Sequence, residues 1–197
     1  MKKLFFIAAL LTAVVFLASG STFAEDQVLF SFEGEDTEGW EIPDWAYEQD
    51  DYLGEELDVS KDVANDGKGS LKLTVNFPGN RWNGAVAEIM EYYDWTPYST
   101  LACDIYVPED APVGLRAKMI LTVGEDWKWT EMSRSVRLKP GEWTHISANL
   151  KPGSTNWRRT KPTDEFRADV RKIAIRIETN KPAYSGPIYI DNIVLGE

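Results

Sequence analysis

Tryptophan is the residue type whose number and surroundings in this sequence suggest a chemical role. The chain of 197 residues contains 8 tryptophans, and five of them stand among polar residues in segments typical of loops and strand edges. A flat indole can cover the apolar face of a pyranose ring while nearby polar side chains bond the hydroxyl groups on its rim. Exposed indoles without such a function are costly. The five that predict a carbohydrate-binding surface are Trp45, Trp82, Trp127, Trp129 and Trp157.

The remaining tryptophans are expected to be structural. Trp40, after a Glu-Gly pair, and Trp143, at the start of a strand-like segment, are expected to face the core, and Trp95 opens a Trp-Thr-Pro-Tyr turn that would close one end of the fold. Sealing a loop onto the core is also the alternative role for any single member of the five. It is a poor explanation for all five together.

Acidic residues near the two ends of the chain form a second candidate site. Glu33 follows the first strand-like segment, Asp191 lies in the last one, and Asp66 belongs to the Gly-rich turn at residues 65–69. If the first and last strands pair, carboxylates and backbone carbonyls meet at this turn and offer the hard oxygen ligands that calcium prefers. The sequence therefore predicts a structural calcium ion, and the alternative is a solvated acidic edge beside an ordinary turn.

Catalytic chemistry has little support. The single cysteine, Cys103, alternates with apolar residues and is expected to be buried, and His145 is the only histidine. Cys-His catalysis and His-rich zinc sites are thus nearly excluded. A small jelly-roll glycosidase or lyase acting on plant cell-wall polysaccharide stays the alternative function, with Glu88, Glu131 and Glu178 as its carboxylates, although their spacing does not demand that chemistry. A cell-surface interaction protein is a third possibility.

The elements that must position these side chains are strands. Alternating apolar and polar residues, separated by turns rich in Gly, Pro and Asp, are typical of an all-β sandwich or jelly roll with two antiparallel sheets. The same alternation turns Arg116, Lys118, Arg176 and Glu178 outward, where they are expected to bond sugar hydroxyls. A helical turn is expected at 164–171. The expected strands are residues 28–32, 69–77, 85–93, 101–107, 115–123, 133–138, 143–150, 170–178 and 188–195.

The first residues predict export from the cell. Two lysines, an unbroken apolar run at 4–18 and a small-residue exit ending at Ala24 have the layout of a secretory signal peptide, too short to span a membrane. We therefore expect a signal peptide at 1–24, a single domain at 25–197 and a secreted protein, extracellular or periplasmic. No other segment predicts a membrane span.

The charge of the chain narrows its partners. The formal net charge is −11, and it becomes −13 when Lys2 and Lys3 leave with the signal peptide. Such an acidic protein repels phosphate backbones and anionic lipids, so neither nucleic acid nor membrane is expected as a partner. Acidic polysaccharides are disfavoured for the same reason, whereas a neutral polymer is not. A separate glycoside hydrolase is left open as a partner.

Several strand sequences resemble those of a known family. The segments 69–75, 104–108, 140–144 and above all 184–195 (Tyr-Ser-Gly-Pro-Ile-Tyr-Ile-Asp-Asn-Ile-Val-Leu) resemble bacterial carbohydrate-binding modules of the jelly-roll, galactose-binding-like type. Their order is most similar to the mannan-binding family-27 modules attached to mannanases. The resemblance extends over nearly all of residues 27–196.

This resemblance implies a function and assigns residues to it. It implies a non-catalytic module that binds a β-linked neutral polysaccharide, with β-mannan first, then β-glucan or xylan. Trp82, which follows Phe77-Pro78-Gly79, would stack on a sugar, Trp127 or Trp129 would provide a second contact, and Trp45 a third.

Overall fold

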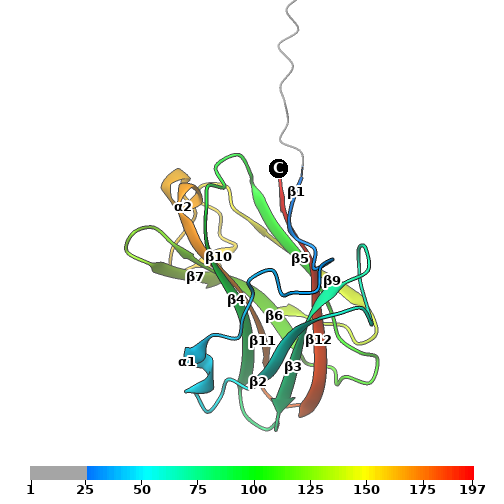
Figure 1. The fold of residues 1–197 in the computed structure, drawn as a ribbon. Helices are drawn as coiled ribbons and strands as arrows, with labels where there is room; N and C mark the ends of the chain where they lie inside the picture. The colour runs from blue at the N-terminus through cyan, green and yellow to red at the C-terminus, as the bar shows by residue number, and fades with distance from the viewer. Residues whose placement is uncertain (1–25) are drawn as a thin grey trace, which may run out of the picture.

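Two antiparallel sheets of six strands each face one another (Figure 1). The computed structural model describes residues 26–197, so the expected signal peptide at 1–24 lies outside the described residues. The first sheet has the order β2 (Gly54–Ser60), β3 (Ser70–Phe77), β12 (Tyr184–Gly196), β5 (Thr100–Tyr106) and β9 (Trp143–Asn149), with β1 (Gln27–Phe30) also paired to β12. The second has the order β10 (Trp157–Arg158), β7 (Lys128–Met132), β6 (Arg116–Val123), β11 (Val170–Thr179) and β4 (Asn83–Tyr93), with β8 (Val136–Arg137) also paired to β6.

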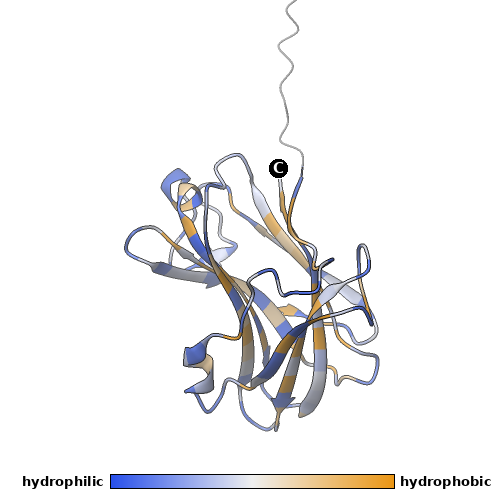
Figure 2. Cartoon of the chain, in the orientation of Figure 1, coloured by the Kyte–Doolittle hydropathy of each residue, from blue (hydrophilic) through white to orange (hydrophobic). Residues whose placement is uncertain are grey.

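The hydrophobic core between the sheets is built from alternate residues of the strands. In β3, Leu71, Leu73, Val75 and Phe77 are at most 1% exposed, and Figure 2 shows hydrophobic and hydrophilic bands alternating along the strands. Cys103 is fully buried on the inner face of β5, as its neighbours predicted. Because side chains alternate between the faces of a strand, this inner set leaves the intervening residues on the outer faces.

The expected all-β sandwich is confirmed, with differences at its edges. β2 was missed because its acidic residues obscure the alternation, a usual feature of strands at a sheet edge, where β2 lies. The expected strand at 133–138 reduces to the two residues of β8, and the short strands β7 and β10 were not predicted. The expected helical turn is α2 (Asp164–Ala168), and a second one, α1 (Asp44–Tyr47), was not predicted. Within residues 26–197, no helix is long and apolar enough to cross a membrane.

The loop that joins β3 to β4 depends on a glycine. Gly79 has φ +80, and a Cβ there would lie 2.8 Å from the backbone nitrogen of Ala183 and 2.9 Å from the carbonyl oxygen of Lys181. Gly153 also has φ +80, yet nothing lies within 4 Å of its Cβ position. Left-handed backbone costs an L-residue about 1–2 kcal/mol.

Gly79→Ala is therefore expected to lower the free energy of unfolding by clearly more than Gly153→Ala, whose loss should be about 1–2 kcal/mol. The additional loss comes from the backbone atoms that must move away from the new methyl group. Urea denaturation of both variants measures the difference. Equal losses would mean that the loop yields to the methyl group at no cost.

Candidate functional site

The outer face of the second sheet carries the polar residues that the alternation predicted. Ile173, Ile175 and Ile177 of β11 are buried in the core, so the residues between them face outward. Antiparallel pairing places Arg176 beside Lys118 and Glu178 beside Arg116 on β6. Towards the other end of the strands, Lys172 pairs with Thr122, Ala174 with Ile120, and Thr122 in turn with Trp129.

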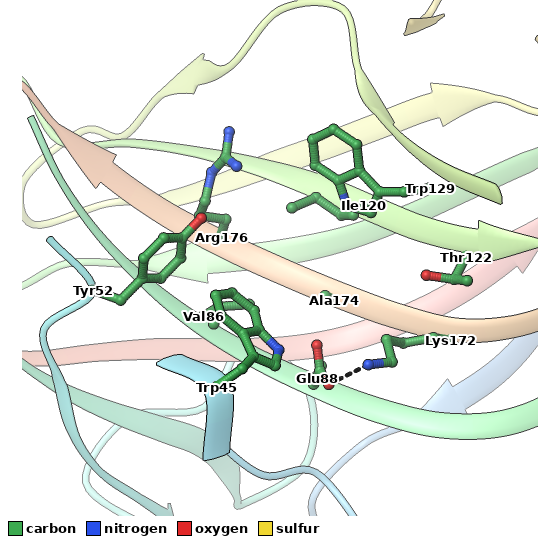
Figure 3. Close-up of a pocket in the computed structure, with 10 residues that line it drawn as sticks. All are labelled: Trp45, Tyr52, Val86, Glu88, Ile120, Thr122, Trp129, Lys172, Ala174 and Arg176. Atoms are coloured by element: carbon green, nitrogen blue, oxygen red, sulfur yellow. Dashed lines mark hydrogen bonds and ion pairs between the residues drawn. The ribbon is translucent and has the colours of Figure 1, made fainter. Parts of the chain in front are cut away.

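A hollow of about 240 Å³ lies on this face, with a tryptophan on each side (Figure 3). In Figure 3, Trp45 stands on one side of β11 and Trp129 on the other. The floor between them combines apolar and polar side chains, which suits a ligand with apolar faces and a polar rim. The lining residues are Trp45, Tyr52, Val86, Glu88, Ile120, Thr122, Trp129, Lys172, Ala174 and Arg176.

The wall on the side of β4 is a chain of aromatic contacts. α1 projects Trp45, which is 40% exposed, while the neighbouring Ala46 is buried. The Trp45 and Tyr52 ring centroids lie 4.9 Å apart, those of Tyr52 and Trp82 lie 5.6 Å apart, and both pairs are edge-to-face. A Cβ at Gly84 would come within 2.9 Å of the Trp82 ring, so this glycine allows the indole to lie against β4. Edge-to-face pairing holds such rings in fixed positions.

Buried charges hold Arg176, which lines one end of the hollow. The Arg176 guanidinium lies 3.0 Å from the Glu131 carboxylate and 3.1 Å from that of Glu178, and it faces the Trp82 ring at 5.7 Å. Glu131 is fully buried and also contacts Arg158 and, at 3.6 Å, Lys118. The pKa of Lys118 is lowered mainly by burial.

An ion pair lies on the floor at the end of the hollow opposite Arg176. The Lys172 ammonium bonds the Glu88 carboxylate across the floor. The Arg159 guanidinium packs on the Trp129 ring with 4.4 Å to its centroid and supports the second wall. Both walls and both ends of the hollow are thus fixed by contacts within the protein.

The structure separates the tryptophans that the sequence had grouped together. Trp45 and Trp129 form the two walls of the hollow. Trp82 contacts Tyr52, which in turn contacts Trp45, so the Tyr52 ring separates the two indoles. Trp127 lies outside the hollow, at the turn between β6 and β7. The expectation for Trp157 is wrong: it is 2% exposed, and its indole N–H donates to the backbone oxygen of Asn149.

The structural tryptophans also divide. Trp40 and Trp95 are buried, as expected. The expected core position of Trp143 is wrong, because this residue lies half-buried on the outer face of the first sheet, with its ring centroid 5.5 Å from that of Tyr106.

Sequence reasoning did not assign three residues of the hollow to carbohydrate binding. They are Tyr52, Glu88 and Lys172. Lys172 has the same outward parity as Arg176 in β11, so the alternation could have found it. Tyr52 lies between α1 and β2, where no periodic pattern indicates its direction.

The predicted acidic cluster is brought together by the pairing of β1 with β12. The Glu33 carboxylate accepts hydrogen bonds from the backbone N–H groups of Lys68 and Gly69, and Asp191 accepts from those of Asn65 and Asp66. The Asp66 residue is itself exposed and joins the cluster through its backbone. Asp191 is fully buried, and its pKa is raised, first by burial and to a lesser extent by the charge of Glu33.

The carboxylate oxygens of Glu33 and Asp191 are ligands of the kind that calcium prefers. A cation would offset the cost of burying Asp191 near Glu33, and calcium accepts backbone carbonyls and water alongside two carboxylates. Within residues 26–197, no group of three or more Asp, Glu, His or Cys side chains is arranged to hold a metal. A calcium ion at this turn would therefore need main-chain oxygens to complete its coordination.

Comparison with known proteins identifies a family whose sequence model matches most of the chain. The sequence model of the family described as Carbohydrate binding module 27 matches residues 24–196. No curated protein matches the sequence.

Solved structures share the fold at low sequence identity. The Caldicellulosiruptor saccharolyticus module CBM27-1, in complex with mannohexaose, is 20% identical with a TM-score of 0.62, over 88% of this chain and 97% of that one. TmCBM27, studied for specific mannan recognition, is 18% identical with a TM-score of 0.52, over 87% and 95%. A Clostridium thermocellum family 11 module with a mixed-linked tetrasaccharide gives the same four values.

Proposed function

Because this chain belongs to the carbohydrate binding module 27 family, we propose that it binds the backbone of β-mannan in the hollow on the second sheet and does not cleave it. The observation that carries this proposal is the placement of Trp45 and Trp129 on opposite sides of a partly polar floor. Two indoles so placed can contact the apolar faces of sugars while the floor bonds their hydroxyls. The related modules studied with mannohexaose and with mannan support this choice of polymer.

The polar partners in this proposal are held ready by the protein. Arg176 is fixed by two carboxylates, and Lys172 is fixed by Glu88. Side chains that are already ordered lose little conformational entropy when a ligand binds. Of the residues predicted to bond hydroxyls, Arg176 lines the hollow, and Arg116 and Glu178 continue the same face beyond it. The expectation for Lys118 is wrong, because this residue is 5% exposed and its ammonium pairs with the buried Glu131.

The carboxylates of this face support binding rather than hydrolysis. Glycosidases use two carboxyl groups, one as an acid and one as a base or nucleophile. Here Glu88 pairs with Lys172, Glu178 with Arg176, and Glu131 is fully buried among three cations. Each of these carboxylates is thus paired with a cation of the protein. Their role in this proposal is to hold the lysine and arginine side chains in position for binding. A separate glycoside hydrolase would then cleave the bound polymer.

Export completes the proposal. β-Mannan is a polymer found outside the cell, and the sequence at 1–24 has the layout of a secretory signal. We therefore place the protein outside the cytoplasmic membrane.

Affinity electrophoresis tests the proposed function. The mature protein is run through gels containing galactomannan, glucomannan, xylan or mixed-linkage β-glucan, and through a gel without polysaccharide. We expect the strongest retardation on the two mannans and no release of reducing sugar from any polymer. Strongest retardation on xylan or β-glucan would contradict the ligand, and released reducing ends would contradict the non-catalytic role.

We also propose that calcium binds at Glu33 and Asp191 and stabilises the fold. Removal of calcium by a chelator should lower the melting temperature by roughly 5–10 °C, since a ligand at about 100 times its Kd contributes about 2.7 kcal/mol. Asp191→Asn should abolish the response to added calcium, whereas Asp126→Asn, at an exposed aspartate on the β6–β7 turn, should keep it. A wild-type melting temperature that does not respond to calcium or chelator would contradict this site.

A further inference from the structure

Two exposed aromatic rings lie beyond the hollow, with an arginine between them. The Arg171 guanidinium lies 5.3 Å from the ring centroid of Tyr92 and 5.4 Å from that of Trp127. Tyr92 is 64% exposed and Trp127 is 43% exposed. We call Tyr92, Arg171 and Trp127 the distal platform. None of the three lines the hollow between Trp45 and Trp129.

The platform continues the floor of the hollow along β11. Arg176, Ala174 and Lys172 lie along that floor, and Arg171 is the next residue of the strand. The pairing of β11 with both neighbours shifts between Val170 and Lys172. A bulge of this kind inserts an unpaired residue and redirects its side chain. Arg171 is that residue, and it lies next to Lys172 at the edge of the hollow.

The turn that presents Trp127 holds an unusual backbone conformation. Trp127 has φ +51, and its N–H donates to the carbonyl oxygen of Gly124, which has φ +73. Positive φ is uncommon for a residue as bulky as tryptophan. Backbone strain of this kind is concentrated at ligand clamps and similar sites, where the surrounding contacts maintain it. Here it directs a large aromatic side chain towards Arg171 on an exposed surface.

The rings of the platform are also fixed before any ligand arrives. The Arg171 side chain donates two hydrogen bonds of 2.8 Å to the Asp169 carboxylate, which places its guanidinium between the two rings. Cation–π contacts then hold each ring against the same group. Rigid aromatic surfaces bind with a small loss of conformational entropy, so the platform is suited to stacking on a flat, partly apolar ligand.

We propose that the distal platform binds the sugar units of a mannan chain that extend past Lys172 out of the hollow. This inference rests on the proposed function, because the occupant is the same polymer. Its consequence is a dependence of affinity on chain length. Short oligosaccharides that fit between Trp45 and Trp129 do not reach the platform, whereas longer ones gain contact with Trp127 and Tyr92.

Titration calorimetry with linear β-1,4-manno-oligosaccharides, from mannobiose to mannohexaose, tests the proposal. Trp127→Ala is expected to bind the shortest measurable oligosaccharide within about twofold of the wild type, and mannohexaose roughly three- to tenfold more weakly. Tyr92→Ala should show the same length dependence. Trp143→Ala is the matched control, since that indole lies on the outer face of the opposite sheet, and its affinities should equal those of the wild type at every length.

Three outcomes would overturn the platform. Equal losses at all lengths in Trp127→Ala would place Trp127 within the main site, and unchanged affinities at all lengths would remove it from binding. A wild-type protein that binds no manno-oligosaccharide would overturn the proposed function, and the platform with it. Melting temperatures of the three variants accompany the titrations, so that a loss of folded protein is not mistaken for a loss of affinity.

Discussion

Trp45→Ala is expected to weaken the binding of mannohexaose by about 1–3 kcal/mol, which corresponds to roughly 5- to 150-fold in Kd. The Trp45 ring forms one wall of the hollow, and its contact with Tyr52 holds it upright over the floor. Removing it exposes one face of the bound sugar to water and deprives the Tyr52 ring of one of its two aromatic partners. Calorimetric titration of both proteins measures the difference.

The fold should tolerate this change. Trp45 is 40% exposed and belongs to a helix of four residues, so the melting temperature should fall by only a few degrees. Trp45→Phe should recover part of the affinity because it keeps an aromatic face. Trp143→Ala again provides the control on the opposite sheet. An affinity of Trp45→Ala equal to that of the wild type would show that the polysaccharide binds elsewhere on the molecule.

Glu131→Gln is expected to lower the free energy of unfolding by roughly 3–5 kcal/mol. This fully buried carboxylate is shared by Lys118, Arg158 and Arg176, and the side chains of Lys118 and Arg176 are at most 10% exposed. Without its negative charge, the two buried cations keep their desolvation cost and lose the partner that offsets it. For a domain of this size, the melting temperature should fall by about 6–20 °C.

Glu142→Gln is the matched control for this charge change. Glu142 pairs with Lys139 at the surface, where both side chains are more than 60% exposed, and such pairs contribute about 0–1 kcal/mol. If Glu131→Gln were as stable as the Glu142→Gln variant, the cations beneath the hollow would be balanced by water or by Glu178 alone. Binding should also weaken in Glu131→Gln, because Arg176 loses one of the two carboxylates that orient it.

Local sequence patterns predicted which residues of several strands face the core. Strand alternation identified the core residues of β3 and the buried position of Cys103, and it identified the outward face that carries Arg176 and Lys118. These features follow from a period of two residues, which every short segment expresses by itself. The edge strand β2 was not predicted, because the acidic residues of an exposed edge strand obscure the alternation of apolar and polar residues.

The acidic cluster was a prediction of a different kind. Glu33 and Asp191 are far apart in the sequence, and their meeting depended on the pairing of the first and last strands, which the structure shows. Their carboxylates bind the backbone of the turn at residues 65–69. The chelator experiment tests the calcium ion proposed at this cluster.

The sequence by itself determined an all-β sandwich, the inner faces of strands such as β3, β5 and β11, and a surplus of tryptophan in polar surroundings suited to carbohydrate. Only the tertiary structure decided which tryptophans act together. Trp157 and Trp129 have similar polar neighbours, yet one is buried against the core and the other walls the hollow beside Arg159. Tyr52 entered the site only when its loop met the strands, and the Glu88–Lys172 pair formed only when β4 and β11 paired. The physical reason is that the direction of a side chain along a strand is set by its nearest neighbours, whereas the path of a loop is set by contacts between residues distant in the chain.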